Sequence, residues 1–118
     1  MIKMTIALTR LERLSSQQFQ EYWRNEHGKL VTGLAEILGI QRYIQAHAIA
    51  PDQLKNGKYY VPPYDGVAEV WYQSYDDFLT RITSAAGRDA AKQLREDEKR
   101  FAQIELSRTW WSDEHEII

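Results

Sequence analysis

The 118-residue chain contains no cysteine. Disulfides, thiolate catalysis and cysteine-ligated zinc or iron–sulfur centres are therefore excluded. The chain also has no run of about 18 consecutive apolar residues, and its first ten residues, MIKMTIALTR, lack the apolar core and cleavage site of a secretion signal. We therefore expect a cytoplasmic protein with no membrane span.

Neither sign of charge is in large excess. Lys and Arg number 15, Asp and Glu number 17, and the formal net charge is −2. Because nucleic-acid binding depends on neutralising phosphates, this balance argues against a nucleic-acid partner. Aromatic residues make up 12% of the chain, more than a small core requires, and this indicates a pocket or an interface. The length predicts one domain that spans residues 1–118.

Alternation of apolar and polar residues predicts four strands. The alternation is clearest in IKMTIALT, where Ile2, Met4, Ile6 and Leu8 share one side. We predict the strands over residues 2–9, 40–49, 67–73 and 103–111.

Capping patterns predict where the helices begin. Ser15 followed by Gln18 predicts a helix that runs to Gly39, which Gly28 either closes early or bends. Ser74 predicts the start of a second helical region, which is interrupted near Gly87 and resumes over residues 88–101. We expect the charged run REDEKR, residues 95–100, to be a solvated surface.

The resulting order is β-α-β-β-α-β, which predicts a ferredoxin-like α+β sandwich. Helices on one side leave the other face of the sheet without cover. We expect aromatic side chains on that face or at its rim, and a second copy of the chain packed against it in a two-fold homodimer. These aromatic residues are Tyr43, Trp71, Trp110 and Trp111.

Residues 14–31, LSSQQFQEYWRNEHGKLV, resemble a pattern of EthD-domain proteins, a branch of the dimeric α/β barrel group. The recurring elements of that pattern are Leu-Ser, Phe, Tyr-Trp and His-Gly-x-Leu-Val. The segments RYIQAH, DGVAEVW and the closing DEHEII also resemble that family's second strand, third strand and tail. The resemblance therefore extends over nearly the whole chain.

The resemblance implies a ferredoxin-like subunit, an obligatory dimeric α/β barrel, and a pocket between the sheet and the helices. Family relatives include muconolactone-type isomerases and fungal dehydratase-like or decarboxylase-like proteins. They act on aromatic or polyketide compounds without a metal or an organic cofactor. The chain departs from the usual His-Gly-Pro-Leu sequence because Lys29 occupies the proline position.

His27 is the first catalytic candidate. Helical spacing places it with Phe19 and Trp23 on the apolar face, and we expect it in the last turn of the first helix. A buried imidazole there can take and return a proton. The alternative is a helix-capping histidine whose ring binds backbone carbonyls.

Tyr43, His47 and Glu69 are the other catalytic candidates. Tyr43 and His47 share one face of a strand, where they could orient a ligand carbonyl, relay a proton, or lie in a dimer interface. Glu69 is predicted on the apolar face of a central strand, where a carboxylate must be paired, protonated or functional. A structural pair with Arg42 or Arg108 is the alternative role for Glu69.

Aromatic side chains are the candidates for contacting a small hydrophobic or aromatic ligand. Tyr22 and Trp23 could equally be core residues, because aromatics at helical spacing usually pack. The tyrosines of the loop over residues 51–65 could close over a flat ligand or only seal the dimer edge. The candidates are Tyr22, Trp23, Trp71, Tyr60 and Tyr64, with Tyr59 in the same loop.

Three functional hypotheses remain open on these residues. The first is a cofactor-independent lyase or isomerase in which His27 does acid–base chemistry on a hydrophobic carbonyl or lactone compound. The second is a non-catalytic protein that carries a hydrophobic metabolite for an oxidase, and the third is a haem-dependent or quinol-dependent monooxygenase. A metal site is not expected, because His27, His47 and His115 lie on different predicted elements without a paired ligand motif.

Overall fold

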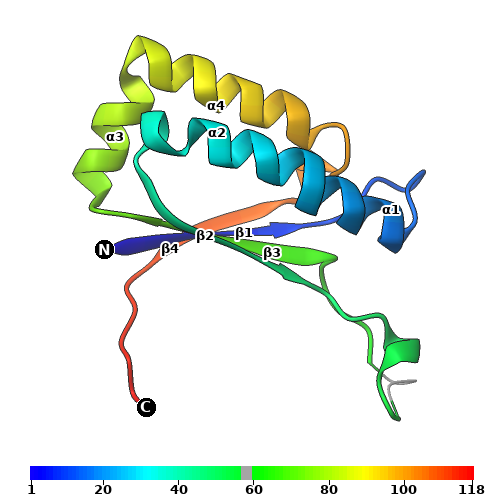
Figure 1. Ribbon diagram of the computed structural model, residues 1–118. Helices are drawn as coiled ribbons and strands as arrows, with labels where there is room; N and C mark the ends of the chain where they lie inside the picture. Colours follow the sequence, from blue (N-terminus) through cyan, green and yellow to red (C-terminus); the bar gives the residue numbers. More distant parts are fainter. Residues whose placement is uncertain (57–59) are drawn as a thin grey trace.

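A four-stranded antiparallel sheet with helices on one face makes up the computed structural model, which describes residues 1–56 and 60–118 (Figure 1). The strand order is β2-β3-β1-β4, so β1 and β3 are central. This α+β architecture is the predicted ferredoxin-like fold. The strands are β1 (Ile2–Leu8), β2 (Ile40–His47), β3 (Gly66–Tyr72) and β4 (Arg108–Ser112).

One nearly continuous helical segment crosses the sheet after β1. It comprises α1 (Ser16–Glu21), the π-helical turn η1 (Tyr22–His27) and α2 (Gly28–Leu38). Ser15 forms the predicted capping box with Gln18, and Gly39 ends α2 with φ of 74°, a conformation that favours glycine. Gly28 does not end the helix. The helix changes from π to α geometry at this residue and continues to Leu38. The prediction that His27 lies in a last helical turn was therefore wrong, since His27 lies inside the segment.

The second helical layer comprises α3 (Tyr75–Thr83) and α4 (Ala85–Glu98). Ser74 caps α3, as predicted, by accepting a hydrogen bond from the Asp77 backbone N–H. The second of these helices starts earlier than predicted, because Ser84 caps it through the Gly87 backbone N–H. Short 3₁₀ turns occur at η2 (Pro51–Gln53) and η4 (Ile104–Leu106).

The fourth strand is shorter than predicted. The backbone N–H of Gln103 bonds to Thr9 and its side chain bonds to the Arg10 carbonyl, which holds this segment beside the end of β1. The chain then makes the 3₁₀ turn η4, and pairing with β1 starts at Arg108. Residues 103–107 therefore do not extend β4.

The two faces of the sheet differ in their cover. Met4, Ile6 and Leu8 of β1 point towards the helices and line a cavity beneath them. On the open face, the register aligns one row across all four strands. From edge to edge this row is Ile44, Glu69, Thr5 and Trp110.

Two of the four aromatic residues expected on the open face lie on the other side. Tyr43 lines the cavity beneath the helices, and the ring of Trp111 packs edge-on against Phe78 at 4.8 Å. Trp71 and Trp110 do lie on the open face, where Trp110 is 49% exposed. The sheet face is therefore less aromatic than predicted.

The core lies between β1, β3 and the helical segment. Phe19 and Phe101 are fully buried, with ring centroids 5.7 Å apart, and Trp23 packs 5.4 Å from Phe19. The remaining buried members of this cluster are Leu8, Ala68 and Ala102.

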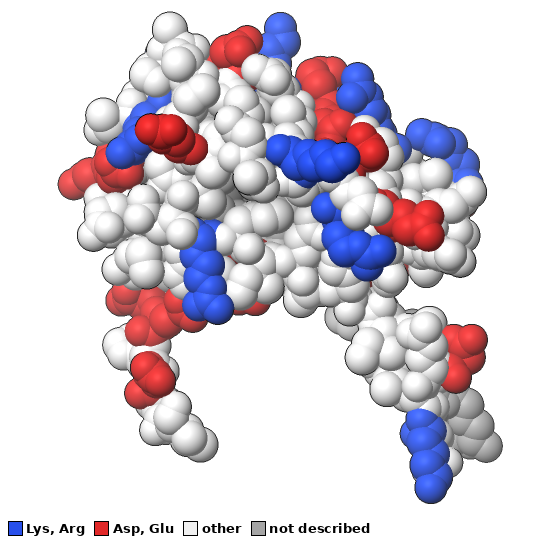
Figure 2. All heavy atoms as spheres, viewed as in Figure 1, with Lys and Arg blue, Asp and Glu red and all other residues white. Residues whose placement is uncertain are grey.

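The β2–β3 connection and the C-terminal tail project from the side of the sheet opposite the helices (Figure 1). They form two arms with an open space between them, and basic and acidic side chains are interspersed over the helical layer (Figure 2). No helix in the described ranges is long and apolar enough to cross a membrane. Tyr59 falls in residues 57–59, outside the described residues.

Candidate active site

The π-helical turn η1 presents Trp23 and His27 to the interior. The Gly28 backbone N–H bonds to the Trp23 carbonyl, five residues back, and the Gln45 side chain of β2 donates to the same carbonyl at 2.9 Å. Such turns are rare and occur frequently at functional sites. The turn positions His27 so that its ring is buried, with 4% exposure.

His27 forms a buried dyad with Asp97 of α4. Its Nδ1 lies 2.8 Å from Asp97 Oδ2, and Asp97 is 5% exposed. The other carboxylate oxygen accepts from the Tyr22 hydroxyl at 2.6 Å and from Arg100 at 3.1 Å. The His27 ring thus binds a carboxylate and not the main chain, which contradicts the capping alternative.

The electrostatics of the dyad favour a neutral imidazole beside a carboxylate. Burial lowers the pKa of His27 and outweighs the opposing effect of Asp97. Burial alone would raise the pKa of Asp97, but hydrogen bonds from Tyr22 and His27 hold it below its ordinary value. An ionised Asp97 accepts the Nδ1–H, so Nε2 of His27 carries the lone pair.

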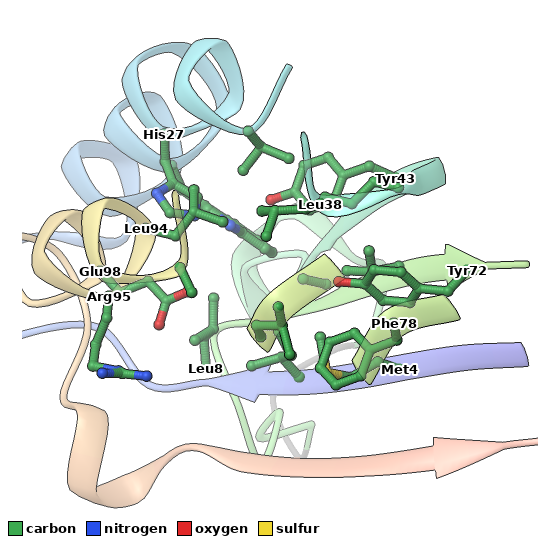
Figure 3. Close-up of a pocket in the computed structure, with 18 residues that line it drawn as sticks. Met4, Leu8, His27, Leu38, Tyr43, Tyr72, Phe78, Leu94, Arg95 and Glu98 are labelled. Carbon is green, nitrogen blue, oxygen red and sulfur yellow. The ribbon is translucent and has the colours of Figure 1, made fainter. Parts of the chain in front are cut away.

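A cavity of about 230 Å³ lies between the helices and the sheet, and His27 lines it (Figure 3). Nε2 of His27 has no hydrogen-bond partner among the described residues. The cavity walls are largely apolar and come from strands and helices on every side. They include Met4, Ile6, Leu8, Val31, Leu38, Val70, Phe78, Ile82 and Leu94.

Polar groups enter this cavity at a few positions. The labelled hydroxyls of Tyr43 and Tyr72 point into it, and the Glu98 carboxyl enters from α4 (Figure 3). The Tyr43 hydroxyl accepts from Gln45 at 3.0 Å. Burial raises the pKa of Tyr72 to about 12, so its hydroxyl stays protonated at neutral pH.

Asp97 and Glu98 are functional candidates that the sequence-based interpretation missed. Both lie in the charged run predicted to be solvated, and that prediction was wrong for these two residues. Their positions relative to Leu94 and Phe101 were an available signal. Steps of three and four residues place the carboxylates on the apolar side of α4.

The structure separates His47 from the cavity. Its ring stacks on Trp23 at 4.4 Å, and its Nε2 lies 2.8 Å from the Gln45 side chain. Trp23 itself lines the cavity, whereas Tyr22 lies behind the dyad and contacts Phe101. Neither Tyr43 nor His47 lies on the open face of the sheet. Neither can therefore contribute to a dimer interface formed by that face.

Glu69 and Trp71 lie on the face of the sheet opposite His27. Glu69 accepts from Lys3 at 2.5 Å, so its partner is neither Arg42 nor Arg108. The two are diagonal neighbours on β1 and β3. Trp71 donates to Glu114 of the tail and carries the Arg42 guanidinium 4.8 Å above its ring.

Tyr60 and Tyr64 lie in the arm that projects from the open face, and neither lines the described cavity. Within one described chain, this arm therefore does not form the expected lid over His27. No group of three or more His, Asp or Glu side chains in the two described ranges is placed to hold a metal ion.

Comparison with known proteins gives matches that cover the whole fold. A crystal structure described as an ethyl tert-butyl ether d (EthD) family protein from Bacillus halodurans has 18% identity and a TM-score of 0.63, covering 98% of this chain and 100% of that one. A dimeric ferredoxin-like protein of unknown function from Bacteroides fragilis has 10% identity and a TM-score of 0.60, covering 95% and 94%. SnoaB from Streptomyces nogalater, described as a cofactor-independent oxygenase, has 10% identity and a TM-score of 0.57, covering 99% and 95%.

No curated protein matches the chain by sequence. The family model described as the EthD domain matches residues 11–105, a range that contains the π-helical turn, His27, Asp97 and Glu98. With most of its length matched, the chain belongs to the EthD-domain family.

Proposed function

We propose that this chain is a small enzyme that transfers protons on a hydrophobic aromatic or polyketide-type compound carrying a carbonyl or lactone group. His27 is the general base and acid, and the reaction is a dehydration, a decarboxylation or an isomerisation without a bound cofactor. The observation that carries the proposal is the buried His27–Asp97 dyad at the wall of an apolar cavity.

The dyad supplies the chemistry that such a reaction requires. Nε2 of a neutral His27 can take a proton from a carbon next to a carbonyl, and the resulting imidazolium stays beside the Asp97 carboxylate. Because both side chains are buried, that charge pair is stronger than it would be in solvent. The imidazolium then returns the proton to carbon or to a leaving oxygen.

The cavity limits the size and polarity of the ligand. An apolar cavity of about 150 Å³ can accept one benzene ring, so about 230 Å³ suits a compound of one or two rings. The wall is mostly aliphatic and aromatic, with Trp23 and Phe78 available to contact a flat ring.

Hydrogen–deuterium exchange of 2-tetralone, a two-ring ketone, tests the proposal. The protein in D₂O should accelerate exchange at the carbon between ring and carbonyl, as followed by NMR. His27→Gln should return the rate to background, a loss of about 10²–10⁴-fold. His47→Gln is the matched control, because His47 is a half-buried histidine that lies outside the cavity. Equal catalysed rates in the wild type and His27→Gln would refute the role of His27.

A cofactor-independent oxygenation is the second candidate, favoured by the likeness to the Streptomyces nogalater protein described in those words. The same base would deprotonate a phenolic ligand before reaction with oxygen. Oxygen uptake that depends on His27 with a hydroxylated aromatic compound would select this candidate over simple proton transfer.

We also infer that the protein acts as a homodimer whose open sheet faces pack together. The open face carries Ile44 and the half-exposed Trp110 in one row, and the two arms flank it. A structural neighbour from Bacteroides fragilis is described as dimeric. Pairing would cover the Ile44 and Trp110 side chains, which are otherwise partly exposed to water.

A further inference from the structure

Glu98 brings a second proton-transfer group to the cavity, from a different helix than His27 (Figure 3). Its carboxyl makes no ion pair and no hydrogen bond with any other described residue. Arg95, one turn earlier on α4, is exposed and also lines the cavity, with its guanidinium below the Glu98 carboxyl in the view of Figure 3. No described basic side chain therefore forms an ion pair with Glu98, and Arg95 acts on it only at longer range.

The surroundings of Glu98 favour its neutral form. Burial raises the pKa of Glu98 to about 7, with a lowering effect from Arg95 and a further raising effect from Asp97. Glu98 is also the last residue of α4, where the carbonyl ends of the helix disfavour a negative charge. The groups that face it across the cavity are His27 from η1, Tyr43 from β2 and Tyr72 from β3.

A neutral carboxyl group differs from a carboxylate because it can donate a hydrogen bond. In an apolar cavity this donor needs an acceptor, since an unmatched buried polar group is costly. The tyrosine hydroxyls on the opposite wall add further donors, whereas Nε2 of His27 accepts. A ligand that matches these donors and the His27 acceptor has a hydrogen-bond-accepting oxygen and, next to it, an acidic C–H.

We propose that Glu98 donates a hydrogen bond to the carbonyl oxygen of the ligand, so that the substrates are neutral hydrophobic ketones or their vinylogues. This assignment rests on the proposed function, in which His27 is the base. Glu98 and His27 then act on the two ends of one keto–enol unit.

The proton transfers balance without an oxidant or a reductant. Nε2 of His27 takes the proton from the carbon next to the carbonyl, and the C–H electron pair forms the new C=C bond. The carbonyl oxygen takes the Glu98 proton, which gives an enol. Return of a proton from the imidazolium to carbon, and of the enol proton to Glu98, restores both residues.

Binding measurements that do not depend on turnover test this assignment. The probes are 2-tetralone, tetralin, which has the same rings without the carbonyl, and 2-aminotetralin, which carries a cation. Dissociation constants are measured by calorimetry at pH 6 and pH 8.5 for the wild type, Glu98→Gln and Glu98→Leu. Binding of tetralin by each variant shows that the cavity is intact.

We expect the wild type at pH 6 to bind 2-tetralone about tenfold more tightly than tetralin, and this preference to decrease at pH 8.5 as Glu98 ionises. Glu98→Gln keeps an N–H donor, so its preference should be the same at both pH values. Glu98→Leu should bind both probes equally. A carbonyl preference that survives in Glu98→Leu would overturn the assignment, as would tight, Glu98-dependent binding of 2-aminotetralin at pH 6, where Glu98 is expected to be neutral.

The same probes separate this inference from the proposed function. A Glu98-dependent carbonyl preference without any His27-dependent exchange would refute the enzymatic proposal and leave carbonyl recognition standing. If exchange depends on His27 but the preference for 2-tetralone over tetralin is unchanged in Glu98→Leu, only the Glu98 assignment is refuted.

Discussion

Asp97 receives hydrogen bonds from three side chains, since His27, Tyr22 and Arg100 all point their donors at its two oxygens. It does not line the cavity and is a positioning residue. Its charge fixes the tautomer of His27 and stabilises the imidazolium that proton abstraction creates.

Replacing Asp97 with Asn should lower the exchange rate of 2-tetralone by about 10²–10⁴-fold. The physical reason is the lost negative charge, which should also lower the pKa of His27 further, as a histidine titration by NMR would show. Glu96→Gln is the matched control in the same charged run, because the Glu96–Lys99 pair is exposed. A pKa of His27 that does not move in Asp97→Asn would contradict the positioning role.

Glu98 should lower the stability of the protein above neutral pH. Its folded pKa of about 7 lies above the ordinary 4.5, so between these values the unfolded chain loses the proton first and stability falls as pH rises. Glu98→Gln should therefore gain about 1–3 kcal/mol over the wild type at pH 8, and less at pH 4.5. Urea unfolding at both pH values measures this, and an equal effect at both would contradict it.

The sequence was sufficient to predict that His27 is buried, because Phe19, Trp23 and His27 recur at four-residue steps. The sequence did not predict that Asp97 is the hydrogen-bond partner of His27. Asp97 and Glu98 lie in a run of charges typical of a solvated helix face, and although their spacing places them on the apolar side of α4, only its packing against η1 brings Asp97 to His27. The Lys3–Glu69 pair likewise depends on the register of β1 against β3, which no local pattern specifies.

At the scale of elements, the start of β3 and the turn η1 approach each other closely. A side chain at Gly66 would overlap the Trp23 ring, so only glycine fits there. Gly33, in contrast, is an exposed residue of α2 with open space around its Cα. The two glycines form a natural pair for comparison.

Gly66→Ala should destabilise the protein by about 1–3 kcal/mol, since Trp23 must move in a packed core. Gly33→Ala should stabilise it by up to about 1 kcal/mol, because alanine has the higher helix propensity. Chemical denaturation of both variants checks the signs. Gly66→Ala should also weaken tetralin binding, because Trp23 lines the cavity.

Most elements could be predicted from periodicity and capping. Three strands agree with the prediction to within one or two residues at each end, and Ser15, Gly39 and Ser74 mark helix boundaries as expected. The fourth strand was predicted too long, because alternation in residues 103–107 continues through a 3₁₀ turn. The π-helical turn was not predicted, and the hydrogen bond that its Trp23 carbonyl accepts from Gln45 of β2 is a contact that no local pattern specifies.

At the scale of the whole molecule, the open sheet face is the surface that the inferred dimer covers. Trp110→Asp should convert the dimer to a monomer, or raise its dissociation constant by at least about tenfold, because it places a charge in an apolar contact. Sedimentation velocity measures the change. Ile37→Asp is the control, since Ile37 is 42% exposed but lies on α2, in the helical layer. A wild type that sediments as a monomer at all concentrations would refute the inferred dimer.

The fold class was predictable because the order of elements and the uncovered sheet face follow from the sequence pattern. The face of the sheet on which each candidate residue lies was only partly predictable. Tyr43 and Trp111 point to the helices, whereas Glu69 and Trp71 point away, so the candidates were divided between two surfaces.

The π-helical turn η1 also determines how the protein tolerates insertions and deletions. A four-residue step exceeds one turn of an α-helix by about 40°, and the wider π turn compensates for this excess. Phe19, Trp23, His27 and Val31 therefore keep one side in common. Loss of a single residue between Tyr22 and Glu26 would rotate α1 by about 100° about the helix axis relative to α2. A change in length there should abolish the site while the composition of the helix stays almost the same.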